Sequence, residues 1–313
     1  MSTSNPQGVF TRVPGFGDTT TMETLDTLGW IKNMKYLVDH LTSLGYRKGE
    51  DLHGAPYDNR HSPESLPHDF HGSMRTLIEE TYKHNINEPV TIISHSYGCI
   101  VTQYFLSMQS AQWKKKYIKQ WIPLAGPFGG TKTQLHLYSS GYLAQLHLLV
   151  NRLTIRGMQR SSTSNLYMLP STAAWTSDDI IAKTQYGTYK IADLDDFLRN
   201  IGFPEGVKMR RYITNSSELM SKGPGVPIHC FHGHIAASTI DYLVFGSSGF
   251  PDYPQSIVKG DGDGEVNAAS LRLCRNFSQV QSEPVSVNEI PGVDHMGIIQ
   301  DEGVFQAISD LLK

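Results

Sequence analysis

The stretch TIISHSYGCIV (91–101) decides the fold, because it joins an apolar β-branched run to a knot of small residues around Ser96. The run VTIIS (90–94) is typical of a buried parallel strand. The segment CIVTQYFLSMQ (99–109) has helical length and contains no helix breaker. SHSYG (94–98) therefore predicts a G-x-S-x-G elbow, with serine in place of the first glycine, in which a sharp strand-to-helix turn exposes a nucleophilic serine. A serine that only caps the helix is the alternative.

The flanking segments extend this unit into a doubly wound α/β sheet. HDFHGSMRTLIEETYKHN (68–85) places apolar residues at helical spacing just before the predicted strand. Between about residues 131 and 221 the pattern loosens over a length too great for an ordinary connection, which predicts a cap over the strand ends. We therefore predict an α/β core in residues 1–130 and 222–313, interrupted by a cap domain in 131–221. Further apolar runs predict strands within IKQWIPLAG (118–126), VPIHCFHG (226–233) and VSVNEIPG (285–292).

A nucleophilic serine needs an acid and a base, and this class of fold supplies them in the order Ser, Asp or Glu, His. His295 lies in EIPGVDHMGII (289–299), after the last predicted strand and before a closing helix, which is where the base belongs. A surface histidine is the alternative. The candidate acids lie in the glycine-rich turn KGDGDGEVN (259–267), for which a plain acidic turn is the alternative; they are Asp261, Asp263 and Glu265.

The composition is that of an ordinary globular protein, since 39% of the 313 residues are hydrophobic and 18% are charged. A net charge of −3 gives no electrostatic case for a nucleic-acid partner. No apolar run approaches the ~20 residues of a membrane-spanning helix. We expect no metal, because His232 and His234 lack an evident third ligand and a calcium loop counted from Asp261 would need glutamate where Arg272 stands.

The sequence gives opposing indications of the cellular compartment. Its start, MSTSNPQGVFTRVPGFG (1–17), has no basic n-region and no apolar h-region, and taken literally it would leave the chain in the cytosol. The sequons at Asn215 and Asn276 would be glycosylated only in a secretory compartment. The cysteines follow no metal-binding spacing and argue mildly for the secretory route; they are Cys99, Cys230 and Cys274.

An ordered series of segments resembles the lecithin–cholesterol acyltransferase family, and most closely its lysosomal phospholipase A2 branch. The resemblance runs from about residue 8 to the C-terminus, and the order of the segments makes it more specific than any single motif. The segments are RVPGFG (12–17), RKGEDLHGAPYDNR (47–60), SHSYGC (94–99), LAGPFGGTK (124–132), YMLPSTAAW (167–175), GDGDGEVN (260–267) and PGVDH (291–295).

This resemblance implies an α/β-hydrolase fold with a cap insertion and assigns a role to each candidate residue. Ser96 would be the nucleophile, Asp263 the acid and His295 the base. Asp263 is preferred to Asp261 because it matches the aspartate of a G-D-G-T-V-like family motif. The backbone N–H of Tyr97, directly after the nucleophile, would be one donor of the oxyanion hole.

The resemblance also bears on the cysteines. Cys230 and Cys274 resemble a family disulfide pair, and Cys99 resembles a free cysteine near the nucleophile. Such a disulfide forms in oxidising compartments, so the resemblance implies a lysosomal or secreted protein.

The sequence departs from the family pattern at three positions near these motifs. Asn59 and Phe128 stand where tryptophan is usual, and Glu265 stands where threonine is usual. We expect these changes to retune the pocket without abolishing the chemistry.

The start of the chain departs further. In the family, the segment that RVPGFG (12–17) resembles lies downstream of a PG-x-LG-like loop that carries the second oxyanion donor. That loop, its strand, a lid and a membrane-binding element have no match here, and losing one oxyanion donor typically costs about 10²–10³ in rate. We interpret the sequence as an incomplete chain; a shortened, catalytically impaired lipid-binding relative is the alternative.

The function that the resemblance implies is that of a serine lipid acyl hydrolase and O-acyltransferase. Ser96 would take a fatty acyl group from a glycerophospholipid, at a membrane or lipoprotein surface, and pass it to water or to a lipid alcohol. Neither a metal nor an organic cofactor is implied.

Overall fold

The central sheet is parallel and carries the strands that the sequence predicted. The computed structural model describes residues 13–24, 32–67, 69–142, 151–213 and 216–313. Strand β5 pairs with β2 on one side and with β7 on the other, and β2 pairs in turn with β1. The carboxyl ends of β1, β2 and β7 therefore meet at one edge, where β5 leaves the central sheet. Their bounds are β1 (Val90–His95), β2 (Ile118–Leu124), β5 (Ile228–Val244) and β7 (Val285–Pro291).

Helices cover both faces of this sheet, because successive side chains of its strands point to opposite faces and apolar residues occur on both. Trp121 packs on one face with α3 (Phe70–His84), α4 (Tyr97–Ser107), α5 (Ala111–Tyr117) and η3 (Arg272–Gln279). Its neighbour Ile122 packs on the other face with α2 (Lys35–Ser43) and α13 (Glu302–Leu312). The predicted helices at 68–85, after the elbow and at the C-terminus are thus confirmed. Shorter elements are α1 (Thr20–Glu23), η1 (Pro63–Ser65), α12 (Ala268–Leu271) and η4 (Gly297–Ile299).

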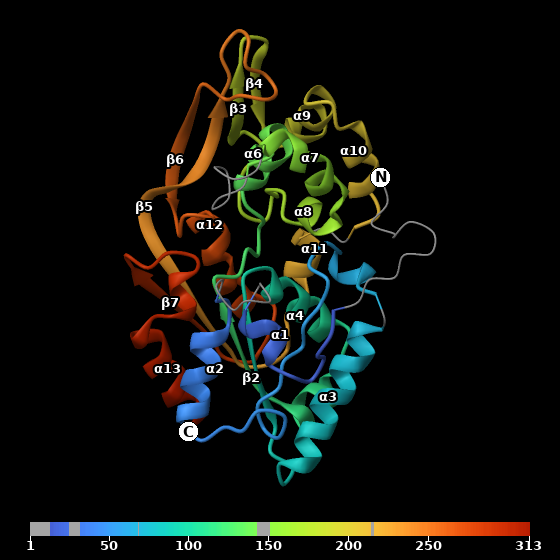
Figure 1. The fold of residues 1–313 in the computed structure, drawn as a ribbon, viewed down its shortest axis with the longest axis vertical. Coiled ribbons are helices and arrows are strands. Elements are labelled where there is room, and N and C mark those ends of the chain that lie inside the picture. Colours follow the sequence, from blue (N-terminus) through green and yellow to red (C-terminus); the bar gives the residue numbers. More distant parts are fainter. Residues whose placement is uncertain (1–12, 25–31, 68, 143–150, 214–215) are drawn as a thin grey trace.

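Strand β5 continues beyond the central sheet into a second, smaller one (Figure 1). Its first part pairs with β2 and β7, and its later part pairs with β6 and β3. The sequence did not predict the β3–β4 hairpin or β6, since their patterns are short and only half apolar. The second sheet takes strands from both sides of residue 221, and the division at 131–221 stays a prediction. The strands are β3 (Ile180–Thr184), β4 (Gly187–Lys190) and β6 (Ser256–Gly262).

Helices α6, α8, α9 and α10, which lie between β2 and β5, pack with this second sheet around a hydrophobic core of their own, and we call this assembly the cap (Figure 1). The fully buried side chains of Phe197 and Leu243 lie in that core. Helix α7 lies against α6, whereas Leu219 and Met220 of α11 pack in the core of the central sheet. The helices between β2 and β5 are α6 (Thr133–Ser140), α7 (Arg152–Ser161), α8 (Thr163–Tyr167), η2 (Ile191–Asp193), α9 (Leu194–Asn200), α10 (Pro204–Arg210) and α11 (Ser216–Ser221).

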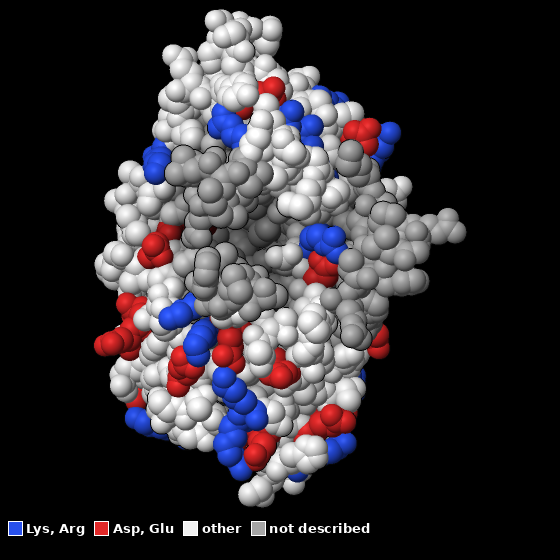
Figure 2. Space-filling view, in the orientation of Figure 1, with Lys and Arg blue, Asp and Glu red and all other residues white. Residues whose placement is uncertain are grey.

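The surface carries charges of both signs. Figure 2 shows Lys and Arg interspersed with Asp and Glu on the face drawn. No helix within the described ranges is long and apolar enough to cross a membrane.

Candidate active site

Ser96 stands at the turn between β1 and α4, as the sequence pattern predicted. Its φ of 53° and ψ of −129° are unusual for a residue with a side chain, and such backbone strain persists only where the surroundings fix it. The Ser96 N–H donates to the carbonyl of Leu124 at the end of β2 (2.9 Å). The turn is thereby tied to the neighbouring strand at the carboxyl edge of the sheet, where ligands bind in α/β folds.

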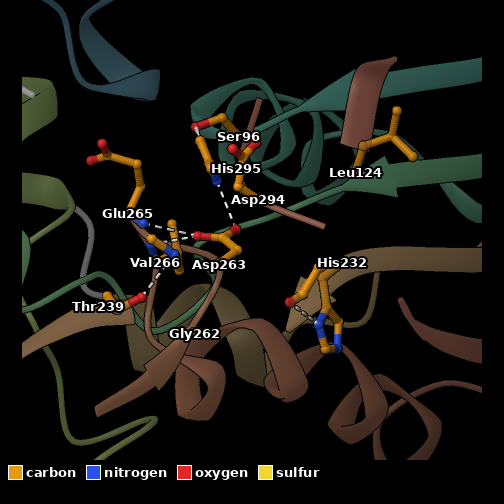
Figure 3. A network of polar contacts seen from close by, with 12 residues as sticks. Ser96, Leu124, His232, Thr239, Gly262, Asp263, Glu265, Val266, Asp294 and His295 are labelled. Atoms are coloured by element: carbon orange, nitrogen blue, oxygen red, sulfur yellow. Dashed lines mark hydrogen bonds and ion pairs between the residues drawn. The ribbon is translucent and has the colours of Figure 1, made fainter. Parts of the chain in front are cut away.

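The structure brings Asp263 and His295 to Ser96 (Figure 3). His295 Nε2 lies 2.8 Å from Ser96 Oγ, and His295 Nδ1 lies 2.8 Å from Asp263 Oδ2. Since an ionised carboxylate only accepts, Nδ1 carries the hydrogen and Nε2 is left to accept from the serine hydroxyl. Residues that are 199 and 32 positions apart in the chain therefore form one hydrogen-bonded series. Their catalytic roles stay predictions.

Asp263 is held ionised although it is fully buried. Its Oδ1 accepts hydrogen bonds from the backbone N–H groups of Glu265 (3.1 Å) and Val266 (2.8 Å). Burial alone would raise the pKa of Asp263, but the charge and hydrogen bond of His295, together with these N–H groups, hold that pKa below its usual value.

The pKa of His295 is shifted in the opposite direction. Burial disfavours the imidazolium, yet the charge and hydrogen bond of Asp263 outweigh it and raise the pKa of His295, with help from the charges of Glu265 and Asp294. The site therefore stabilises the protonated ring that forms when a serine gives up its proton.

His95 supports His295 from the side of β1, and sequence reasoning missed it. Its Nε2 lies 2.8 Å from the backbone carbonyl of His295, and the two rings lie 4.9 Å apart. No sequence signal marks this role, because the position directly before the nucleophile is a variable one in the elbow motif.

Ser94, the first small residue of the elbow, uses its hydroxyl in two hydrogen bonds that glycine could not make. Its Oγ accepts a hydrogen bond from Trp121 Nε1 (2.8 Å) and donates to Cys99 Sγ (3.4 Å). Cys99 is fully buried, and burial raises the pKa of its thiol to about 12. The thiol is therefore a packed structural group and not a second nucleophile.

Tyr97 is the first residue of α4, and its side chain is anchored by a hydrogen bond from Oη to the carbonyl of His61 (2.8 Å). The first N–H groups of a helix lack partners within it. The Tyr97 N–H is accordingly placed to act as an oxyanion donor, a role that stays a prediction.

The remaining candidate residues lie away from Ser96. Cys230 of β5 and Cys274 of η3 form the disulfide that the resemblance implied. Asn276 is half-buried within η3, and Asn215 lies outside the described residues. Asp261 is exposed and faces His234 (3.4 Å), so it takes no part in the series around His295. Within the described ranges, no cluster of three or more His, Cys, Asp or Glu side chains could hold a metal ion.

The departures from the family pattern fall in different surroundings. Phe128 is buried and packs edge-on against Trp121 and Phe277 at ring-centroid distances of 6.0 and 5.4 Å. Asn59 is exposed. Only Glu265 is adjacent to the hydrogen-bonded series.

The fold and the arrangement at Ser96 define this protein as an α/β hydrolase. A solved structure described as the Tle4–Tli4 complex shares the fold, with a TM-score of 0.58 and 12% identity over 82% of this chain and 68% of that one.

More specifically, the chain belongs to the lecithin:cholesterol acyltransferase family, whose model matches residues 1–222 and 203–302. It is 36% identical to the lysosomal phospholipase A and acyltransferase of Canis lupus familiaris, over 95% of this chain and 72% of that protein. It is 35% identical to the protein of that name from Homo sapiens, over 95% and 71%. The phosphatidylcholine-sterol acyltransferase of Gallus gallus is 32% identical, over 95% and 70%.

Proposed function

We propose that this protein is a serine lipid acyl hydrolase and O-acyltransferase that takes a fatty acyl group from a glycerophospholipid. Its relatives are named for phospholipase and acyltransferase activities. The observation that carries the residue assignment is the series Asp263–His295–Ser96, in which both hydrogen bonds measure 2.8 Å.

In the first half of the reaction, Ser96 Oγ attacks the ester carbonyl carbon while its proton passes to His295 Nε2. Asp263 keeps the imidazole in the required tautomer and stabilises the imidazolium. The Tyr97 N–H stabilises the developing oxyanion, aided by the positive end of α4. The tetrahedral intermediate then expels the lysolipid alcohol, which takes the proton from His295, and acyl–Ser96 remains.

In the second half, water or a lipid alcohol gives its proton to His295 and attacks the acyl carbonyl. The proton returns to Ser96 as a fatty acid or a new ester leaves. Which acceptor reacts depends on how far water is kept from acyl–Ser96.

The disulfide between Cys230 and Cys274 supports an oxidising compartment, lysosomal or secreted, as the place of action. The names of the protein's relatives, which mention phospholipase and phosphatidylcholine, also support a phospholipid surface as the source of substrate.

A fluorophosphonate probe tests the assignment of the nucleophile. We expect labelling of the wild-type chain at Ser96, located by mass spectrometry, and none in Ser96→Ala. Asp263→Asn, which leaves His295 in the wrong tautomer, should label about 10⁴-fold more slowly. If a folded wild-type chain is not labelled, or is labelled equally in Ser96→Ala, the assignment is wrong.

The transfer reaction is tested with phospholipid vesicles that contain a long-chain lipid alcohol. We expect free fatty acid and the alcohol's acyl ester to appear together, and both to be lost in Ser96→Ala. Acyl transfer that persists in Ser96→Ala would contradict a shared acyl–Ser96 intermediate.

A further inference from the structure

The turn between β6 and α12 carries a second acidic residue beside the one that contacts His295. Besides donating its N–H to Asp263, Glu265 accepts with its carbonyl from the hydroxyls of Thr131 (2.7 Å) and Thr133 (2.9 Å). Its backbone is thus fixed from the side of Asp263 and from the start of α6. None of these contacts involves its carboxylate.

The Glu265 side chain leaves the turn on the side on which Ser96 and His295 lie, and no dashed line reaches its carboxylate (Figure 3). Within the described residues, no hydrogen bond or ion pair holds this carboxylate, although the residue is half-buried. Burial raises the pKa of Glu265, and the positive charge of His295 opposes that rise. When the Glu265 carboxylate is ionised, protonated His295 is the positive charge that stabilises it.

Each element around the pair contributes a titratable group. His295 faces His95 from β1, Asp263 and Glu265 from the β6–α12 turn, and Asp294 from its own loop. Glu265 faces the acidic groups Asp263 and Asp294, and Tyr142 after α6. Asp294 and Asp263 accept hydrogen bonds, whereas no hydrogen bond to the Glu265 carboxylate is found among the described residues.

We propose that Glu265 is an electrostatic positioning residue that acts through His295, stabilising the imidazolium and thereby setting the pH range in which Ser96 is activated. This inference rests on the function proposed above. The physical reason is that a carboxylate in a partly buried site, weakly screened by solvent, favours a nearby positive charge. The imidazolium exists in the transition state and not in the resting base, so Glu265 stabilises the transition state more than the ground state.

The test is the pH dependence of kcat/KM in Glu265→Gln. Glutamine keeps the size of the side chain and every backbone contact, but it removes the charge. Because the carboxylate raises the pKa of His295, its loss should move the acidic limb of the profile to lower pH, by about half a unit to one unit. The plateau kcat should fall about 2- to 3-fold, since a less basic His295 accepts the proton less readily.

Asp261→Asn is the matched control. Asp261 lies close by in the sequence, but it is exposed and faces His234. The acidic limb of the kcat/KM profile of Asp261→Asn should therefore coincide with that of the wild type. The rate of fluorophosphonate labelling should show the same limb as turnover in all three proteins, because both reactions need neutral His295.

An acidic limb in Glu265→Gln that coincides with the wild type overturns the inference. A changed KM with an unmoved limb does so too, since it would make Glu265 a substrate contact. These failures differ from a failure of the proposed function, in which the wild-type chain would neither be labelled nor turn over lipid.

Discussion

His95 stands next to the nucleophile in the sequence but acts on the loop that carries the base. Because the His295 carbonyl only accepts, His95 Nε2 must carry a hydrogen, and the ring is a fixed donor. Burial, followed by the charge of His295, lowers the pKa of His95 to about 3. The ring is therefore neutral wherever His295 works, and it adds no charge that would oppose the imidazolium.

Removing only this donor should slow catalysis without weakening substrate binding. In His95→Phe an aromatic ring remains and the hydrogen bond is lost, which leaves the carbonyl of the buried His295 without this donor at a cost of about 1.4 kcal/mol. We expect kcat to fall about 10-fold with KM unchanged. His95→Gln, which can still donate, should recover part of that loss. Steady-state kinetics on vesicles check both variants, and a wild-type kcat in His95→Phe would contradict the role.

At the scale of elements, Arg160 of α7 ties the ends of two other cap helices together. Its guanidinium donates to the carbonyl of Tyr138 near the end of α6 (2.8 Å), and to those of Ile201 (2.9 Å) and Gly202 (3.0 Å) just after α9. The last carbonyls of a helix have no partner within it and carry the negative end of the helix dipole. One side chain thus satisfies acceptors on two helices that the chain itself does not connect directly.

Lysine cannot replace this arrangement, because it lacks the planar set of donors that reaches several carbonyls at once. Arg160→Lys should lower the free energy of unfolding by about 2 kcal/mol, since it leaves carbonyls unpaired. Arg199→Lys is the control, because its pair with Asp196 is exposed and should contribute less than about 0.5 kcal/mol. Thermal unfolding of the two variants measures the difference, and equal Tm values would refute the role of Arg160.

At the scale of the whole molecule, cap and core are parts of one folded structure because β5 runs through both sheets. The cap also places a titratable group in its interior. His136 of α6 is 4% exposed, its ring stacks on Tyr142, and neither ring nitrogen finds a hydrogen-bond partner within the described residues. Burial, followed by the charge of Arg152, lowers the pKa of His136 to about 4.

This histidine should make the protein less stable in acid. An unfolded chain protonates His136 near pH 6.5 while the folded one does not, so stability present above pH 6.5 is lost as pH falls toward about 4. At pH 5 the loss should be roughly 2 kcal/mol. His136→Phe keeps the ring and removes the titration, so its stability should fall less between pH 7 and pH 5.

Denaturant titrations at pH 7 and pH 5 measure this difference, with the exposed His84 as control in His84→Gln. The control should keep the wild-type pH dependence. A wild-type pH dependence in His136→Phe would show that His136 is not its source.

The sequence by itself determined the features that depend on neighbouring residues. The strand before Ser96, the helix after it and the histidine loop after the last strand follow from local periodicity and turn chemistry. The order of these motifs also placed the chain in its family. These signals lie within short windows, so they could be interpreted before any folding was known.

Only the tertiary structure decided the features that join distant segments. The extension of β5 into a second sheet depends on β3, β4 and β6, whose short half-apolar patterns are ambiguous alone. Three features of the site depend on segments of the chain that are distant in sequence and adjacent in space. They are the hydrogen bond between Trp121 and Ser94, the hydrogen bond from His95 to the His295 carbonyl, and the side on which Glu265 projects. The physical reason is that hydrogen bonds and charges act across a few ångströms regardless of sequence separation, whereas periodicity reports only on the residues nearby.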